Sequence, residues 1–144
     1  MPSLFAGLAV AAGATVDAVF SEGFHLEPLA PPPAAPGRVR DVNARLVAST
    51  ARAALAFIGT WVEPGELMNA HGRTKADSTT HWVAGAKAMI DAPADGLAQR
   101  PQTGDRVHRD DTGAAYEVAK VLDGDFGRLR IFVTDAAQRA EAPR

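Results

Sequence analysis

The chain has 144 residues, a length that fits one domain around one core, and its formal net charge is −2 at neutral pH. That charge gives no basis for binding many nucleic-acid phosphates, which requires a concentrated basic surface. The absence of cysteine excludes disulfides, thiolate nucleophiles and cysteine-based zinc sites, and it fits a reducing compartment.

The composition predicts a thin core. Apolar residues make up 47% of the sequence, but many of them are alanines, which bury little area, and aromatic residues make up only 6%. A core of this kind gains from burial against partner subunits, so we expect the protein to assemble with other chains.

The segment from Ser3 to about Phe20 predicts an amphipathic helix with Ser3 as its N-cap. Apolar residues recur in it with a spacing of four, at Leu4, Leu8, Ala12, Val16 and Phe20. We expect this stripe to pack against the core, because Gly7 and Gly13 each weaken the helix by up to about 1 kcal/mol.

The same segment does not have the pattern of a targeting sequence. No lysine or arginine precedes Arg38, so the basic start of a secretory signal is not expected. Asp17 interrupts an apolar run that is too short to span a bilayer.

The next segment, FHLEPLAPPPAAPG, predicts a short strand followed by an extended connector. Phe24 and Leu26, with Leu29 as a further candidate, are expected on one side of the strand. The prolines between residues 31 and 36 cannot donate ladder hydrogen bonds and favour an extended backbone.

Residues 38–63 contain one ambiguous stretch and one clear strand. VNARLV at 42–47 fits a strand, with Val42, Ala44 and Leu46 alternating, whereas STARAAL at 49–55 equally fits a capped helical turn. LAFIGTWV at 55–62 predicts a strand before the turn sequence Glu-Pro-Gly, and Gly59 in it indicates a bulge or a close backbone approach.

Residues 65–80 are polar and predict a long loop between strands, of the kind that often carries function. The segment THWVAGAKAMIDA then predicts a strand, broken near Gly85.

The last third predicts a β-meander. Three short strands, at 106–109, 115–121 and 128–133, are separated by the turn sequences DDTGA and LDGDFG. In the middle strand Val121 breaks the alternation of side chains, which indicates a bulge near Ala119 and Lys120.

His108, Asp110 and Asp111 are the candidates for chemistry, as metal ligands or an acid–base pair. However, Asp-Asp-Thr-Gly is also what a tight turn requires, since aspartate bonds its own backbone and glycine accepts a positive φ, and we favour the turn. The sequence contains no phosphate-loop, Gly-x-Ser-x-Gly or His-Glu-x-x-His motif. We therefore expect no catalytic residue, no cofactor and no metal, and an enzyme is not the favoured class.

Trp61 and Trp82 are the largest side chains on the predicted strands. No basic groove accompanies them, so we interpret them as core residues or subunit-interface anchors rather than as a platform for stacking bases.

Several of these features occur together in one known family. In chain order they are an N-terminal helix LFAGLAVAAGATVDAVF, a GD.V step at 104–107, a Y.V strand at 116–118, a short acidic turn and a closing GRLRI strand at 127–131. The order resembles that of the head-tail joining proteins of tailed bacteriophages, which are also called head-completion, stopper or tail-attachment proteins. The similarity covers most of the chain.

The resemblance implies a mainly β (α+β) fold: a small antiparallel β-barrel or β-sandwich with an N-terminal helix and a long inter-strand loop. We expect a single domain over 1–144, with the helix in 1–21, the β-domain in 22–134 and a flexible tail in 135–144. The proline insertion and the alanine-rich stretch at 49–56 depart from the family pattern.

The resemblance also implies a role in the virion neck. The protein would form a ring, a hexamer in this family, between the portal-adaptor complex on the head side and the tail terminator or tail tube on the tail side. It would be assembled in the bacterial cytoplasm, with transient contact to packaged DNA and no membrane. The candidate channel loop is Glu66, Asn69, His71, Arg73, Lys75 and Asp77.

Three alternatives stay open at this point. A tail-terminator or adaptor ring belongs to the same neck. A small metal-dependent hydrolase would use His108, Asp110 and Asp111. A peptide-binding adaptor would use an open sheet edge.

Overall fold

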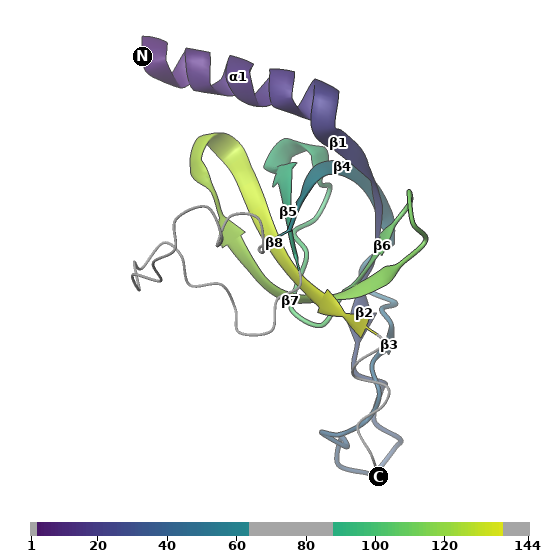
Figure 1. The fold of residues 1–144 in the computed structure, drawn as a ribbon. Coiled ribbons are helices and arrows are strands. Elements are labelled where there is room, and N and C mark those ends of the chain that lie inside the picture. Colours follow the sequence, from purple (N-terminus) through teal and green to yellow (C-terminus); the bar gives the residue numbers. More distant parts are fainter. Residues whose placement is uncertain (1–2, 64–87, 137–144) are drawn as a thin grey trace, which may run out of the picture.

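The computed structural model describes residues 3–63 and 88–136, in which one helix precedes a closed six-stranded antiparallel β-barrel (Figure 1). The strands follow the order β1–β4–β5–β8–β7–β6, and pairing of β1 with β6 closes the barrel. The elements are α1 (Leu4–Phe20), β1 (Ser21–Glu27), β2 (Leu29–Ala30), β3 (Val47–Ala48), β4 (Leu55–Val62), β5 (Ala88–Pro93), η1 (Ala94–Gly96), β6 (Arg106–Arg109), β7 (Ala115–Asp123), η2 (Asp125–Gly127) and β8 (Arg128–Asp135). The predicted mainly β fold with an N-terminal helix is confirmed, as a barrel.

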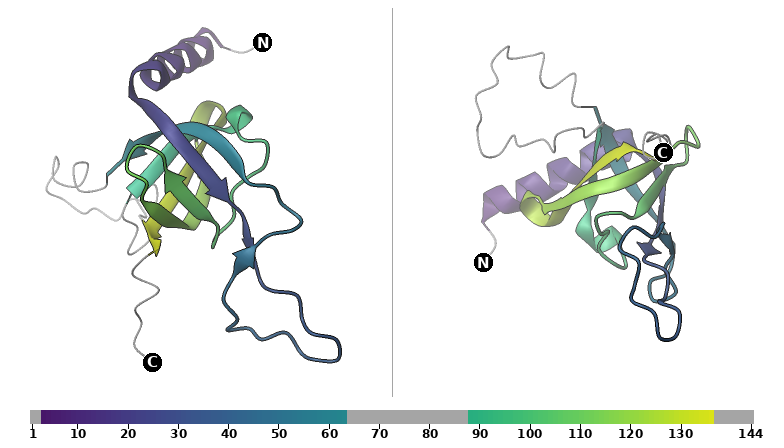
Figure 2. Two further views of the ribbon diagram at one scale, coloured as in Figure 1. Left: turned by 90° about the vertical axis from the view of Figure 1, so that its right-hand side faces the viewer. Right: turned by 90° about the horizontal axis from the view of Figure 1, so that it is seen from below.

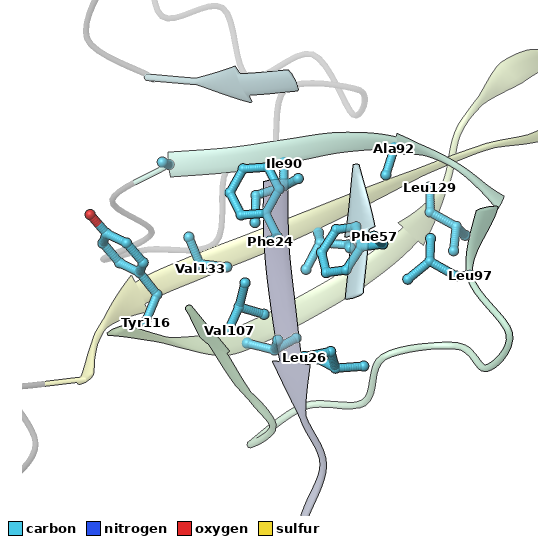
Figure 3. Close-up of a cluster of buried hydrophobic side chains, with 13 residues drawn as sticks. Phe24, Leu26, Phe57, Ile90, Ala92, Leu97, Val107, Tyr116, Leu129 and Val133 are labelled. Atoms are coloured by element: carbon cyan, nitrogen blue, oxygen red, sulfur yellow. The ribbon is translucent and has the colours of Figure 1, made fainter. Parts of the chain in front are cut away.

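The core fills the inside of the barrel (Figure 3). Phe24 and Leu26 of β1 are fully buried, as predicted, and the ring of Phe24 stacks on Phe57 with 5.4 Å between centroids. Leu29 is only half-buried, because β2 has left the barrel. Alternate residues along each strand point inward, so the period-two pattern of each strand buries one of its faces inside the barrel.

Strand β4 coincides with the predicted strand, and the close-approach alternative for Gly59 is confirmed. A Cβ atom at Gly59 would lie 2.8 Å from Ile90 Cγ2 and 3.2 Å from Ala92 Cβ, both on the neighbouring strand β5. Glycine therefore lets these two strands pack closely.

The predicted β-meander is confirmed, since β6, β7 and β8 are sequential neighbours in the barrel. The predicted bulge is present as a register shift between Val118 and Lys120. The turn between β6 and β7 is tight: Gly113 has φ of 67° and its N–H donates to the carbonyl of Arg109 at 2.8 Å.

Of the residues 42–47 that alternate as in a strand, only Val47 lies in one, the two-residue strand β3. Residues 31–46 instead form a segment, hereafter the arm, that protrudes from one end of the barrel, and only the two-residue strands β2 and β3 pair at its base (Figure 2). Val42 is 90% exposed, so the alternation of Val42 with Ala44 does not correspond to a buried strand face.

Residues 49–55 do not form the helical turn that was the alternative prediction for them. The hydroxyl of Ser49 accepts hydrogen bonds from the N–H groups of Ala51 and Arg52, at 3.2 and 3.1 Å, as a helix cap would. The chain then enters β4 at Leu55, because that strand buries its side chains in the barrel.

Helix α1 begins and ends close to the predicted residues, and the Ser3 hydroxyl accepts a hydrogen bond from the N–H of Ala6 at 3.1 Å. The expectation that its apolar stripe packs on the core is wrong. No residue of α1 is buried, and none belongs to the core cluster. The predicted break near Gly85 and the loop at 65–80 lie outside the described residues.

Candidate functional site

Helix α1 rests on the barrel through small and polar residues. Ala6, Ala9, Gly13 and Asp17, spaced three or four apart, are its only residues that are not exposed. This spacing places them on one side of the helix, which is therefore the side that faces the barrel.

The remaining surface of α1 carries large apolar residues that face solvent. Among them are Leu4, Phe5, Leu8, Val16 and Val19, which we call the outer face of α1; its first three residues are 92%, 73% and 69% exposed. Exposed apolar surfaces of this continuity mark interaction sites. Within the described residues no helix has the length and hydropathy needed to cross a membrane.

A charged contact explains why the helix is turned this way. Asp17 is the one charged residue of α1, and both of its carboxylate oxygens accept hydrogen bonds at 2.8 Å from the guanidinium of Arg128. Nε of Arg128 also donates to Asp91 Oδ1 at 2.9 Å. Aligning Asp17 with Arg128 directs the outer face away from the barrel, whose interior the strands already fill.

The same contact shifts the pKa values of its partners. The hydrogen bond from Arg128 lowers the pKa of Asp17, against a smaller opposing effect of burial. The hydrogen bond to Asp17, with that to Asp91, raises the pKa of Arg128. The pair is therefore ionised throughout the neutral range.

A second charged contact, hereafter the latch, holds the base of the arm. Asp105 is fully buried, and Arg52 donates to both of its oxygens, at 2.8 and 2.6 Å. The N–H groups of Leu29 and Gln102 donate to the same carboxylate at 3.0 and 2.8 Å. Arg52 also donates to the carbonyl of Leu29 at 3.0 Å, so the latch joins β2 and the segment after β3 to the loop before β6.

His108, Asp110 and Asp111 are not brought together as one site. Asp110 Oδ1 lies 2.5 Å from Nδ1 of His25, whereas Nε2 of His108 lies 3.3 Å from Glu27. Asp111 lies exposed in the tight turn, and the turn interpretation of this sequence is confirmed. Among residues 3–63 and 88–136, no group of three or more candidate ligands could hold a metal ion.

Trp61 packs on the edge of the core. The centroid of its ring lies 4.8 Å from that of Tyr116 and 6.3 Å from that of Phe24. The guanidinium carbon of Arg109 lies 4.6 Å from the centroid, above the ring. Its role as an interface anchor stays a prediction. Trp82 lies outside the described residues, as do the candidate channel-loop residues Glu66, Asn69, His71, Arg73, Lys75 and Asp77.

Neither the two charged contacts nor the exposure of the outer face of α1 is predicted from the sequence. Asp17 carried a signal, as the only charge in an apolar helix. The latch carried none, because Arg52 and Asp105 are separated by 53 residues and no local pattern around either residue points to the other.

No protein-family model matches the chain, and no curated protein matches it either. The resemblance to the head-tail joining proteins therefore stays a prediction. Of the expectations drawn from it, the fold class is confirmed.

Asp17→Asn should loosen α1 from the barrel, at a cost of about 1–2 kcal/mol, since a hydrogen bond to a charged group is lost. Because the folded-state pKa of Asp17 is lowered, its stabilising effect is complete above the unfolded pKa and is lost as pH falls through the folded pKa. The helical signal at 222 nm in a urea titration should thus differ between wild type and variant at pH 7, and the difference should shrink at pH 3.

Asp111→Asn is the matched control. Asp111 is exposed in the turn after β6 and forms no ion pair with a described residue, so this change should leave the titration at pH 7 unaltered. An Asp17→Asn protein with the wild-type titration at both pH values would contradict the role of the contact.

Proposed function

We propose that this protein is a structural component of the neck of a tailed phage or phage-derived particle. It joins the DNA-filled head to the tail and closes the portal channel as a head-tail connector or stopper. It acts as a ring of identical copies, as the family resemblance implies, and it performs no catalysis.

The outer face of α1 carries this proposal. A closed barrel has its own core, so five exposed apolar residues on one helix are not needed for folding of the described part of the chain. The helix has no basic residue, so it lacks the charge that would attract an anionic membrane or nucleic acid. An uncharged apolar face of this kind fits a protein partner, as a neck protein requires.

The partners follow from the resemblance. The portal-adaptor complex lies on the head side and the tail terminator or tail tube on the tail side. The loop from Glu66 to Thr80, outside the described residues, is the candidate for lining or closing the channel, where it would contact DNA transiently.

The alternatives gain less support. A tail terminator or adaptor of the same neck would use the same apolar face and differs in where its ring sits. A metal-dependent hydrolase would require His108 beside Asp110, but these residues contact Glu27 and His25 respectively. A peptide adaptor would require an open edge, and the six barrel strands leave none in the part of the chain that the structure describes.

Negative-stain microscopy of particles from a strain without this protein tests the proposal. We expect finished tails separated from heads that are filled or have leaked DNA. Normal particles would refute a joining role. Joined particles with tails of abnormal length would point to a tail terminator instead.

A complementation experiment links the role to α1. Leu4→Ser with Leu8→Ser should fail to restore joining, because it makes the outer face polar. The control is Ala98→Ser with Lys120→Ser, which places two serines on exposed positions outside α1 and should restore it. Equal complementation by both pairs would remove α1 from the proposal.

A further inference from the structure

The tip of the arm is ordered by two turns. The N–H of Arg38 donates to the carbonyl of Ala35 at 3.0 Å, with Gly37 at φ of 76°. The N–H of Ala44 donates to the carbonyl of Asp41 at 3.2 Å, and the Asp41 side chain accepts from the N–H of Asn43 at 2.9 Å. The tip thus presents a defined surface.

That surface is basic and apolar. Arg38, Arg40 and Arg45 form no ion pair with any described residue. Val39 and Val42 stand between them, 96% and 90% exposed. Arginines that alternate with exposed valines fit a groove with an apolar floor and an acidic rim better than they fit a row of phosphates, which offers no apolar contact.

The latch gives the arm a fixed direction. Because Asp105 joins Arg52, Leu29 and Gln102, both chain segments at the base of the arm are tied to the barrel. A protruding segment that is held in place in the free protein loses less conformational entropy on binding.

A groove of matching character lies beside α1. It has a volume of about 460 Å³ and an apolar lining that includes Ala9, Val10, Ala14, Pro93, Ala94 and Phe126. Phe126 is 52% exposed and has a positive φ of 57°, a backbone conformation that costs about 1 kcal/mol or more and often marks functional sites.

The rim of this groove is acidic. Asp95 lines it, and Asp125 precedes Phe126 in η2. Both are exposed, and neither forms an ion pair within the described ranges. Among the described residues that line the groove Arg128 is the one basic residue, and it is already bound to Asp17 and Asp91.

The arm and the groove lie at opposite ends of the barrel: α1, η1 and η2 surround one end and the arm extends from the other (Figures 1 and 2). An arm therefore cannot fill the groove of its own chain. A contact between copies would be heterologous, so each copy gives one arm and receives another, and such contacts generate closed rings or open chains.

We propose that the arm tip of one copy binds in the α1 groove of a second copy, with Val39 and Val42 on the apolar floor and Arg38 and Arg40 facing Asp95 and Asp125. This contact would connect neighbouring subunits of the assembly, and in that respect it rests on the proposed function.

Cysteine cross-linking tests the contact directly, because the chain contains no cysteine of its own. Full-length Val39→Cys and Ala94→Cys proteins are mixed under mild oxidation. A disulfide-linked pair of the two should form, with a yield about tenfold or more above that of Lys120→Cys mixed with Ala94→Cys, because binding raises the effective concentration of the thiols. Lys120 is exposed on β7 and serves as the matched control.

Charge reversal provides the specificity test. Arg38→Glu with Arg40→Glu in the Val39→Cys protein should reduce the yield to the control level. Asp95→Arg with Asp125→Arg in its partner should restore it. A chain that carries both Val39→Cys and Ala94→Cys should give a ladder or a ring of linked copies rather than dimers alone.

Two outcomes would overturn the inference. One is a yield equal to that of the control pair. The other is salt-dependent binding of a labelled DNA duplex that the arm reversal abolishes, without any cross-link. Either result leaves the neck role untouched, since that role is decided by the morphology of particles from the deletion strain.

Discussion

Asp105→Ala is expected to destabilise the protein by about 3–5 kcal/mol, because it removes one partner of a buried ion pair. Arg52 would keep its charge without a carboxylate, although its side chain is only 19% exposed. The N–H groups of Leu29 and Gln102 would lose their acceptor as well. The effect should appear as a lower midpoint in urea unfolding with an unchanged slope.

An exposed ion pair is the matched control. Asp123 lies 2.5 Å from Arg100, as close as Asp105 lies to Arg52, but its side chain is 77% exposed. Asp123→Ala should therefore cost less than about 1 kcal/mol. Similar losses of unfolding free energy for Asp105→Ala and Asp123→Ala would show that burial does not set the strength of the latch.

A second comparison separates the latch from the cost of an unpaired charge. Replacing Arg52 by methionine in the Asp105→Ala protein removes that charge and should recover part of the lost stability. It should not restore the direction of the arm. The cross-link between Val39→Cys and Ala94→Cys should therefore stay weak in the double variant even where the barrel is folded.

The strands of the barrel were predictable because their signals are local. Leu55–Val62 has β-branched and aromatic residues and ends before the sequence Glu-Pro-Gly, which is typical of turns. The turn after Arg109 has the Asp and Gly that it needs. Even the bulge near Lys120 follows from one break in alternation. The sequence did not decide between barrel and sandwich, since closure depends on pairing β1 with β6 across the length of the chain.

The two errors have a common cause. Periodicity identifies an apolar side of a segment, but not what covers it. The stripe that begins at Leu4 has the spacing of a core-facing helix, and residues 42–46 have the alternation of a strand, yet both lie on the surface. In α1 the deciding contact is between Asp17 and Arg128, 111 residues apart, which no local pattern reveals.

Gly59→Leu should destabilise the barrel by about 2–3 kcal/mol, as overpacking does at tightly packed positions. The added Cβ would lie 2.8 Å from Ile90 Cγ2 and 3.2 Å from the carbonyl oxygen of Asp91. Ile90 is fully buried, so its branch has no free space to move into, and the backbone of Asp91 is fixed by pairing with Thr60. Strands β4 and β5 would have to separate, and thermal unfolding should show a lower midpoint.

Gly59→Ala and Gly7→Ala together distinguish this close approach from a general effect of replacing glycine. Both add one methyl group, but an added Cβ at Gly7 meets no atom within 4 Å. Gly7→Ala should stabilise α1 by up to about 1 kcal/mol, because alanine loses less backbone entropy in a helix. Gly59→Ala should be destabilising, because its methyl group meets the same Ile90 and Ala92 side chains. If both changes stabilised the protein, β4 and β5 would have to be farther apart than the pairing of Thr60 with Asp91 requires.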